Sequence, residues 1–341
     1  MCRTQNFYGH GKLLLTGEYF VLDGALGLAL PATVGQMLNV KYRPSFTTHL
    51  DWKSFTSSNE IWFHAKYDLW HFDIIEMDVP QAQTQAQAQN QAQTQAQAEV
   101  LQRVLRQARI QNPHFLRERE DISVEMRLEF PINWGLGASS TLIYNVAQWA
   151  HIEPFELLSK TMGGSGYDVA CAQASGPIIY QRTESGGQEW SHVDFNPSFK
   201  DNLYFVYSGN KQSTAEAISQ YKSANNNREK NKSIIEEIDE ITKELAVTKS
   251  FIYFKKLIAE HEDICSKFLE REKVKNLFLK DFSGEVKSLG AWGGDFWLVA
   301  SDMTPSDTTN YFYQRDFKTV IPYCELVYYA ESNKSESKFK G

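Results

Sequence analysis

A run of alternating apolar and polar residues leads directly into a glycine-rich loop and then into a helical segment between positions 122 and 150. The run ISVEMRLEF (122–130) has the two-residue period of a strand, and TLIYNVAQWA has the apolar spacing of a helix. Between them lies PINWGLGASST (131–141), in which Gly135 and Gly137 let the backbone come close to a ligand. The free N–H groups and positive dipole end of the following helix attract an anion. The segment therefore predicts an anion site, although a capped helix after an ordinary tight turn fits the same residues.

Three hydroxyl side chains at the start of that helix can bind phosphate oxygens or a magnesium ion attached to them: Ser139, Ser140 and Thr141. The patterns of other phosphate loops are missing, since GxxxxGK[ST] does not occur and no GxGxxG follows a strand. The catalytic loop of protein kinases is missing as well. On its own, the loop leaves the phosphate interpretation and the structural one open.

Three other segments hold residues that suit phosphoryl transfer, and each also has a structural interpretation. GGSGYDVA (163–170) places Asp168 after three glycines, where a carboxylate either orients or deprotonates an acceptor or begins a helix as its N-cap. SLGAWGGD (288–295) places glycines before an apolar strand, where they fit a substrate loop or only a turn or bulge. Lys12 lies between a glycine turn and an apolar strand, so it either neutralises phosphate charge or is a solvated surface charge.

Composition excludes several classes of protein. The chain has 341 residues, of which 42% are hydrophobic, enough for a buried core and two ordinary domains. Its formal net charge of -7 argues against a general binder of nucleic acid or of anionic membranes. The four cysteines lie far apart, as is typical of reduced thiols. The apolar run at 13–15 is too short for a signal peptide and no stretch approaches a membrane span, so we expect a cytoplasmic protein.

Local composition separates a β-rich first part from a helical later part. The first forty residues alternate β-rich runs with glycine turns, which predicts short strands. The Gln/Ala tract at 81–98 is low in complexity and cannot build a core, so it either extends the amphipathic helix that follows or is a disordered insertion. Heptad-like apolar spacing predicts helix over about 226–279, and strands are expected near 290–300 and 324–329.

Three segments, in this order, resemble the motifs of the GHMP kinases: GHGKLLLTGEYFVLDG the first, PINWGLGASST the second and KSLGAWGGDFWLVA the third. The resemblance extends over most of the chain and implies an α+β fold of two domains, with ATP and acceptor bound in the cleft between them. We expect an N-terminal ATP-binding domain at 1–190, which includes the 81–98 insertion, and a C-terminal domain at 191–341. The implied activity is that of an ATP-dependent phosphotransferase, which transfers the γ-phosphoryl group of ATP to a small molecule with Mg²⁺ as the second cofactor.

The resemblance also implies roles for individual residues. Asp168 would face the acceptor, and Lys12 would assist Asp168 and offset the transferred charge. The loop would wrap the ATP phosphates through Gly135, Leu136, Gly137, Ala138, Ser139 and Ser140, and Ser139 would also bind the magnesium. Residues of two later segments would contact the acceptor: Lys211, Ser213, Thr214, Gly290, Gly293, Gly294 and Asp295.

Within the family, the closest likeness is to the mevalonate-pathway branch of isoprenoid biosynthesis, particularly the phosphomevalonate kinases, because GSGYDVA and GGD resemble their segments. Phosphomevalonate is therefore the expected acceptor. The alternatives are a mevalonate kinase that acts on the mevalonate hydroxyl, a diphosphomevalonate decarboxylase, or a catalytically silent metabolite-binding homologue.

The chain departs from the family at Ala138, where serine is common, and at Trp292, which replaces a glycine and could reshape the pocket. Glu156 is a poor match to the magnesium-binding glutamate of mevalonate kinases. The oligomeric state is open between monomer and homodimer.

Overall fold

The computed structural model describes residues 3–46, 48–78, 85–183, 185–209, 221, 228–290 and 294–330, with 85–91 and 228–230 described by their backbone alone. The chain forms two compact units. The first consists of Met1–Lys12 and Val34–Gln173, and the second of Leu13–Thr33 and Ala174–Gly341. The second unit thus includes a segment from near the N-terminus. The domain boundary at 190 stays a prediction.

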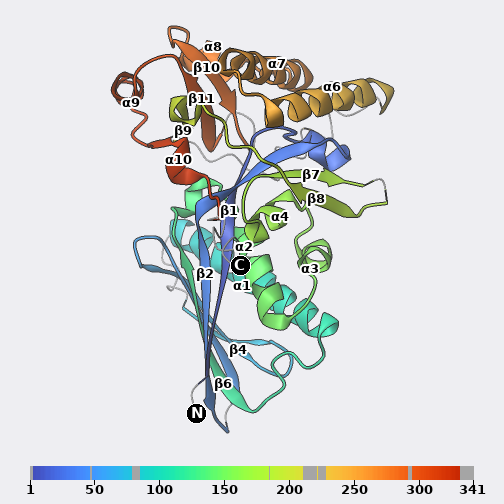
Figure 1. Ribbon diagram of the computed structural model, residues 1–341. Coiled ribbons are helices and arrows are strands. Elements are labelled where there is room, and N and C mark those ends of the chain that lie inside the picture. The colour runs from blue at the N-terminus through green and yellow to red at the C-terminus, as the bar shows by residue number, and fades with distance from the viewer. Residues whose placement is uncertain are drawn as a thin grey trace, which may run out of the picture. The chain divides into compact units, whose positions relative to one another are not determined.

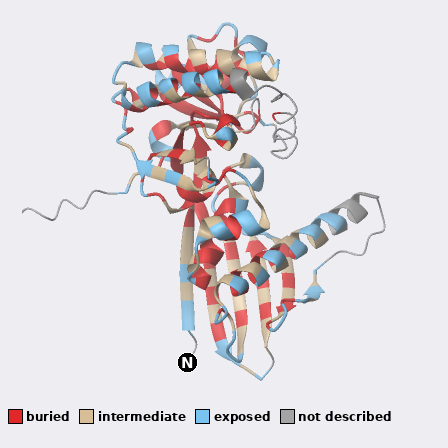
Figure 2. Cartoon of the chain, turned by 90° about the vertical axis from the view of Figure 1, so that its right-hand side faces the viewer, coloured by how far each residue is buried: buried red, intermediate tan, exposed pale blue. Residues whose placement is uncertain are grey.

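The first unit is a sheet with helices packed on it (Figure 1). Its strands follow the order β5-β4-β3-β6-β2, with β1 paired to β2; β3 and β6 are parallel, and the pairs β2–β6, β3–β4 and β4–β5 are antiparallel. The strands are β1 (Arg3–Leu14), β2 (Gly27–Pro44), β3 (His49–Phe55), β4 (Ile61–Asp68), β5 (Ile74–Met77) and β6 (Glu120–Leu128). Buried residues alternate along β3, β4 and β6, as Figure 2 shows for this sheet, because successive side chains point to opposite faces.

In the part of this unit that the structure describes, four helices and a short 3-10 turn accompany the sheet: α1 (Gln85–Gln111), η2 (Ile132–Trp134), α2 (Ala138–Ala150), α3 (Pro154–Thr161) and α4 (Tyr167–Gln173). Helix α1 begins inside the Gln/Ala tract, so from residue 85 onward the tract extends the helix that follows it. Its apolar stripe, which includes Leu101, Val104 and Leu105, packs in one core with sheet residues such as Trp52 and Tyr67. This core holds α2 and α4 in place, and both bear predicted site residues.

In the second unit, the beginning of β2 pairs with β7 (Ile178–Arg182), which pairs with β8 (Gln188–His192). A separate antiparallel sheet has the order β10-β11-β9-β12, formed by β9 (Leu203–Tyr207), β10 (Gly284–Ser288), β11 (Phe296–Ser301) and β12 (Val320–Pro322). Helix α7 packs on β10 and α6 on α7 (Figure 1). Within its described residues, this unit has the helices and turns η1 (Phe20–Asp23), η3 (Lys200–Asn202), α6 (Arg228–Val247), α7 (Phe251–Leu269), α8 (Val274–Phe278), α9 (Pro305–Tyr313) and α10 (Tyr323–Leu326).

The predicted helical region at 226–279 corresponds to α6, α7 and α8, and the strand predicted near 290–300 corresponds to β11. The strand predicted at 324–329 is wrong, because α10 occupies its first half and Val327 forms only an isolated bridge with Ala32. Pro322 precedes this helical turn and lacks the N–H that would continue a ladder.

Among the described residues, no helix has both the length and the apolar character needed to cross a bilayer.

Candidate active site

The end of β1 lies against the glycine loop in the first unit. The Lys12 N–H donates a hydrogen bond of 3.0 Å to the Leu136 carbonyl. Gly135 and Gly137 both have left-handed backbone, with φ of 67° and 89°. A Cβ atom on Gly137 would lie 3.0 Å from Cγ of Lys12, so a side chain at this position would push against the lysine. The predicted ATP loop and the predicted catalytic lysine are therefore neighbours, and glycine is needed where they meet.

Helix α2 begins directly after the loop. The Gly137 carbonyl accepts the N–H groups of Ser140 and Thr141, both at 3.0 Å. In the first turn of α2, this leaves the N–H groups of Ala138 and Ser139 for a ligand. The hydroxyls face differently. Ser139 is exposed, whereas Thr141 is buried and donates to Gln36 Oε1 at 2.7 Å. Thr141 thus has a structural role, and the exposed Ser139 hydroxyl fits a phosphate or magnesium ligand.

Asp168 lies in the first turn of α4, which packs against α2. Its Oδ2 accepts a hydrogen bond from the buried hydroxyl of Ser140, and its Oδ1 accepts the N–H of Val169 at 3.2 Å. The Lys12 ammonium lies 5.3 Å from the ring centroid of Tyr167, the residue before Asp168. We call Lys12, Gly137, Ser140, Tyr167 and Asp168 the aspartate site. It brings together predicted residues that are far apart in the sequence.

Burial shapes the chemistry of the groups beside Asp168. It raises the pKa of the Tyr167 phenol, although a hydrogen bond and the positive charge of Lys12 act in the opposite direction. One turn along α4, burial also raises the pKa of the Cys171 thiol. Both groups therefore stay protonated at neutral pH. Asp168 is the only member of the aspartate site with a carboxylate, a group that can accept a proton from a ligand.

The third predicted segment lies in the second unit, at the turn between β10 and β11. The Leu289 N–H donates to the Phe296 carbonyl at 3.0 Å, and the Ser208 N–H donates to the Asp295 carbonyl at 2.8 Å. Gly290 has left-handed backbone, and a Cβ on it would lie 3.6 Å from Asp295 Oδ2. Asp295 itself has a φ of 43°, unusual for a residue other than glycine. Gly294 is described and buried. Trp292, Gly293, Lys211, Ser213 and Thr214 lie outside the described residues.

No protein-family model and no curated protein sequence matches the chain. Solved structures do match over nearly all of it. The mevalonate kinase of L. major in complex with R-mevalonate is 15% identical, with a TM-score of 0.65, 97% of this chain and 98% of that chain covered. The phosphomevalonate kinase of Streptococcus pneumoniae in complex with phosphomevalonate and AMPPNP is 16% identical, with a TM-score of 0.62 and 93% and 97% covered. This chain has the fold of these kinases. The predicted α+β fold of the GHMP kinases is thereby confirmed.

The mevalonate diphosphate decarboxylase of Staphylococcus aureus also matches, at 10% identity and a TM-score of 0.58, with 97% of each chain covered. The kinase fold thus occurs with more than one acceptor and more than one reaction among the matches. The fold alone does not select among mevalonate, phosphomevalonate and the diphospho acid.

The kinase-type fold also holds a buried ion cluster in its second unit, which the sequence interpretation missed: Glu18, His261, Glu262 and Lys287. The Lys287 ammonium donates to Glu18 Oε1 and, at 3.0 Å, to the Ser288 carbonyl, and it lies 3.8 Å from Glu262 Oε1. Burial alone would lower the pKa of Lys287, but the charges of Glu18 and Glu262 outweigh it and raise that pKa. Glu18 and Lys287 both lie within the motif-like segments, and that position was the signal that the sequence offered.

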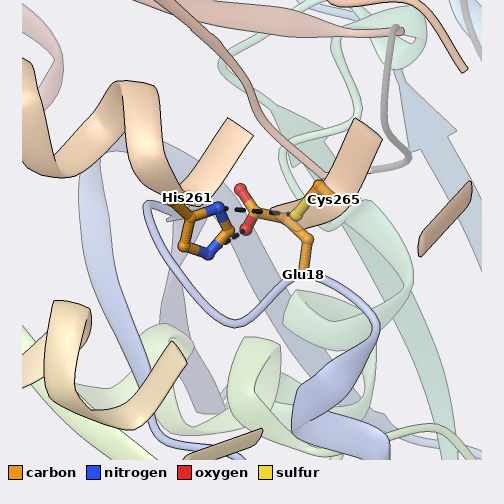
Figure 3. Close-up of side chains that lie close together, drawn as sticks. All are labelled: Glu18, His261 and Cys265. Carbon is orange, nitrogen blue, oxygen red and sulfur yellow. Dashed lines mark hydrogen bonds and ion pairs between the residues drawn. The ribbon is translucent and has the colours of Figure 1, made fainter. Parts of the chain in front are cut away.

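Figure 3 shows that Glu18, His261 and Cys265 also come close together. One potential ligand atom from each lies within 4.8 Å of the others. The ring of His261 is already occupied on both sides, because Nε2 accepts the Gly17 N–H at 3.1 Å and Nδ1 lies 3.5 Å from Cys265 Sγ. The cation beside Glu18 is Lys287, so we interpret the group as an ion network and not as a metal centre.

Proposed function

We propose that the chain is an ATP-dependent small-molecule kinase of the GHMP family, acting in the mevalonate pathway, with phosphomevalonate as its acceptor. The observation that supports this most is the aspartate site. Its cation, glycine loop, helix N-terminus and carboxylate meet in one compact unit, and these are the groups that phosphoryl transfer needs. The fold match to kinases over more than nine tenths of the chain supports the same function.

The loop and the start of α2 fit the phosphates of ATP, since they present N–H groups and the positive end of a helix dipole. Ser139 offers an exposed hydroxyl oxygen, a donor that suits Mg²⁺. Bound magnesium would neutralise charge on the phosphates during transfer. Lys12 would offset the same charge from the β1 side of the loop, which its contact with Gly137 favours.

In the reaction, an acceptor oxygen forms a bond to the γ-phosphorus while the bond from that phosphorus to the β–γ bridging oxygen breaks, releasing ADP. If the acceptor is the phosphate of phosphomevalonate, it is already mostly ionised, and Asp168 orients it. If the acceptor is the hydroxyl of mevalonate, its proton passes to the Asp168 carboxylate. The later segments would contact the acceptor through Lys211, Ser213, Thr214, Gly290, Gly293, Gly294 and Asp295.

The test is coupled ADP release with Mg-ATP and a panel of acceptors that contains mevalonate, phosphomevalonate, homoserine and several sugars. We expect turnover with phosphomevalonate above that with the others. Turnover with mevalonate alone would change the acceptor but keep the kinase. Carbon dioxide release from the diphospho acid would instead identify a decarboxylase, and ATP binding without turnover on any acceptor would indicate a silent homologue.

A further inference from the structure

Two consecutive serines at the start of α2 have different surroundings. Ser139 is exposed, whereas Ser140 is only 4% exposed. The backbone N–H of Ser140 donates to the Gly137 carbonyl at 3.0 Å, and its hydroxyl donates to Asp168 Oδ2. A hydroxyl has a single proton. Both donors of Ser140 are therefore used inside the protein, and neither is left for a phosphate oxygen.

The bond from Ser140 joins two elements that are distant in the sequence. Ser140 lies in the first turn of α2 and Asp168 in the first turn of α4. An aspartate side chain rotates easily about its last torsion, so a carboxylate without partners has a broad range of orientations. With Oδ2 bound to α2 and Oδ1 bound to the Val169 N–H at 3.2 Å, that range is reduced. The same turn that would bind the phosphates also sets the direction of the carboxylate.

We propose that Ser140 is a positioning residue for Asp168 and not a ligand of the ATP phosphates, a role that rests on the proposed kinase function. This changes its assignment from the sequence, which placed Ser140 in the phosphate loop together with Ser139. The two neighbouring serines then have different roles. Ser139 binds the nucleotide and magnesium, and Ser140 orients the carboxylate that faces the acceptor. A loop that orients both substrates from one helical turn keeps their spacing fixed.

Ser140→Ala and the matched control Ser139→Ala separate these roles by steady-state kinetics. Losing a hydrogen bond to a charged acceptor should lower kcat of Ser140→Ala by ~10- to 100-fold, with the KM for ATP nearly unchanged. Ser139→Ala should instead raise the KM for ATP or the magnesium requirement. If Ser140→Ala raises the KM for ATP and keeps kcat, Ser140 is a phosphate ligand and the proposal is wrong.

A double-variant cycle asks whether Ser140 acts through Asp168. In the Asp168→Ala background, adding Ser140→Ala should change kcat by less than about 2-fold, because the group it positions is already gone. A full loss in both backgrounds would overturn the proposal. The cycle is repeated with thermal unfolding midpoints, where the two losses should again be non-additive. The unfolding midpoints and the equilibrium binding of a fluorescent ATP analogue test the Ser140–Asp168 contact without any turnover. Absence of turnover on every acceptor would therefore contradict the proposed function, and not the positioning role of Ser140.

Discussion

The aspartate site and the buried ion cluster are both built from a lysine and carboxylates, yet their surroundings differ. Lys12, at the end of β1, and Asp168, in the first turn of α4, are half-buried. Lys12 bonds to the glycine loop and Asp168 to the start of α2. Glu18 and Lys287 have side chains with no exposed area and neutralise each other's charge. Charge that is partly open to solvent can be redirected to a ligand, whereas charge compensated in a core cannot leave its partner without a large desolvation cost. Motif position alone does not separate the two, since both lie in motif-like segments.

The largest effect should come from breaking the buried ion cluster. Lys287→Met leaves Glu18 and Glu262 without their cation, which should lower the free energy of unfolding by ~3–5 kcal/mol. Urea unfolding measures the loss. Adding Glu18→Gln should recover part of it by removing one of the unpaired charges. Lys243→Met, at an exposed lysine paired with Glu240 on α6, is the matched control and should unfold close to the wild type. Equal midpoints for the Lys287 and Lys243 variants would show that burial does not distinguish these pairs.

Substitution of Asp168 in the aspartate site should lower catalytic activity more than stability. Asp168→Ala should lower turnover by at least ~100-fold and leave ATP affinity largely unchanged, because a positioned carboxylate is lost while the loop remains. Coupled ADP release and nucleotide binding measure the two quantities. Asp168→Asn sharpens the result, since the amide oxygen still accepts the Ser140 hydroxyl but is a poor base. Activity retained by Asn points to an orienting role, and near-normal activity of the alanine variant removes Asp168 from the site.

A smaller effect is expected from disturbing the contact between Lys12 and the glycine loop. Gly137→Ala should cost ~1–2 kcal/mol because alanine is disfavoured at positive φ, and its Cβ should also displace Lys12 and lower kcat. Gly163→Ala is the matched control, since Gly163 also has positive φ, 67°, but a Cβ there meets nothing within 4 Å. Both variants should lose stability in urea unfolding. Only the first should lose turnover, and equal kcat values would show that the Lys12 contact is unimportant.

Local patterns predicted the strand, loop and helix around the aspartate site correctly, because alternation and apolar spacing are properties of neighbouring residues. They failed where partners are distant. Short strands were expected in the first forty residues, but β2 runs from Gly27 through Pro31 to Pro44. Its two ends pair with different strands, β7 and β6, so glycine and proline are tolerated between the paired stretches.

The candidate site was predictable to the same extent. Lys12, the loop and Asp168 were identified from residue type and order, but whether they carry out the predicted roles stays a prediction. The bond from Ser140 to Asp168 and the pairing of Glu18 with Lys287 join residues 28 and 269 positions apart. No spacing rule connects such pairs, so the sequence assigned both serines to phosphate and gave the buried ions no role.

The smallest expected effect is the pH dependence of stability, which tests the buried ion cluster through His261. Burial, followed by the charge of Lys287, lowers the pKa of His261 well below its ordinary value. In the unfolded chain the pKa of this histidine is about 6.5. Below that pH the unfolded state therefore binds a proton that the folded state does not bind. The stability that His261 contributes is therefore present above this pH and is lost as the pH falls.

We expect the free energy of unfolding of the wild type to decrease between pH 6.5 and 5.5 by about 1 kcal/mol more than that of His261→Gln, whose amide oxygen still accepts the Gly17 N–H. The groups that face His261 are Glu18, Cys265 and Lys287. Burial raises the pKa of Glu18 despite Lys287, so Glu18 acts in the opposite direction, and the difference between the two proteins is the quantity to measure. His114→Gln, at an exposed histidine, should follow the wild type. Parallel pH profiles for wild type and His261→Gln would mean that His261 takes up its proton without unfolding.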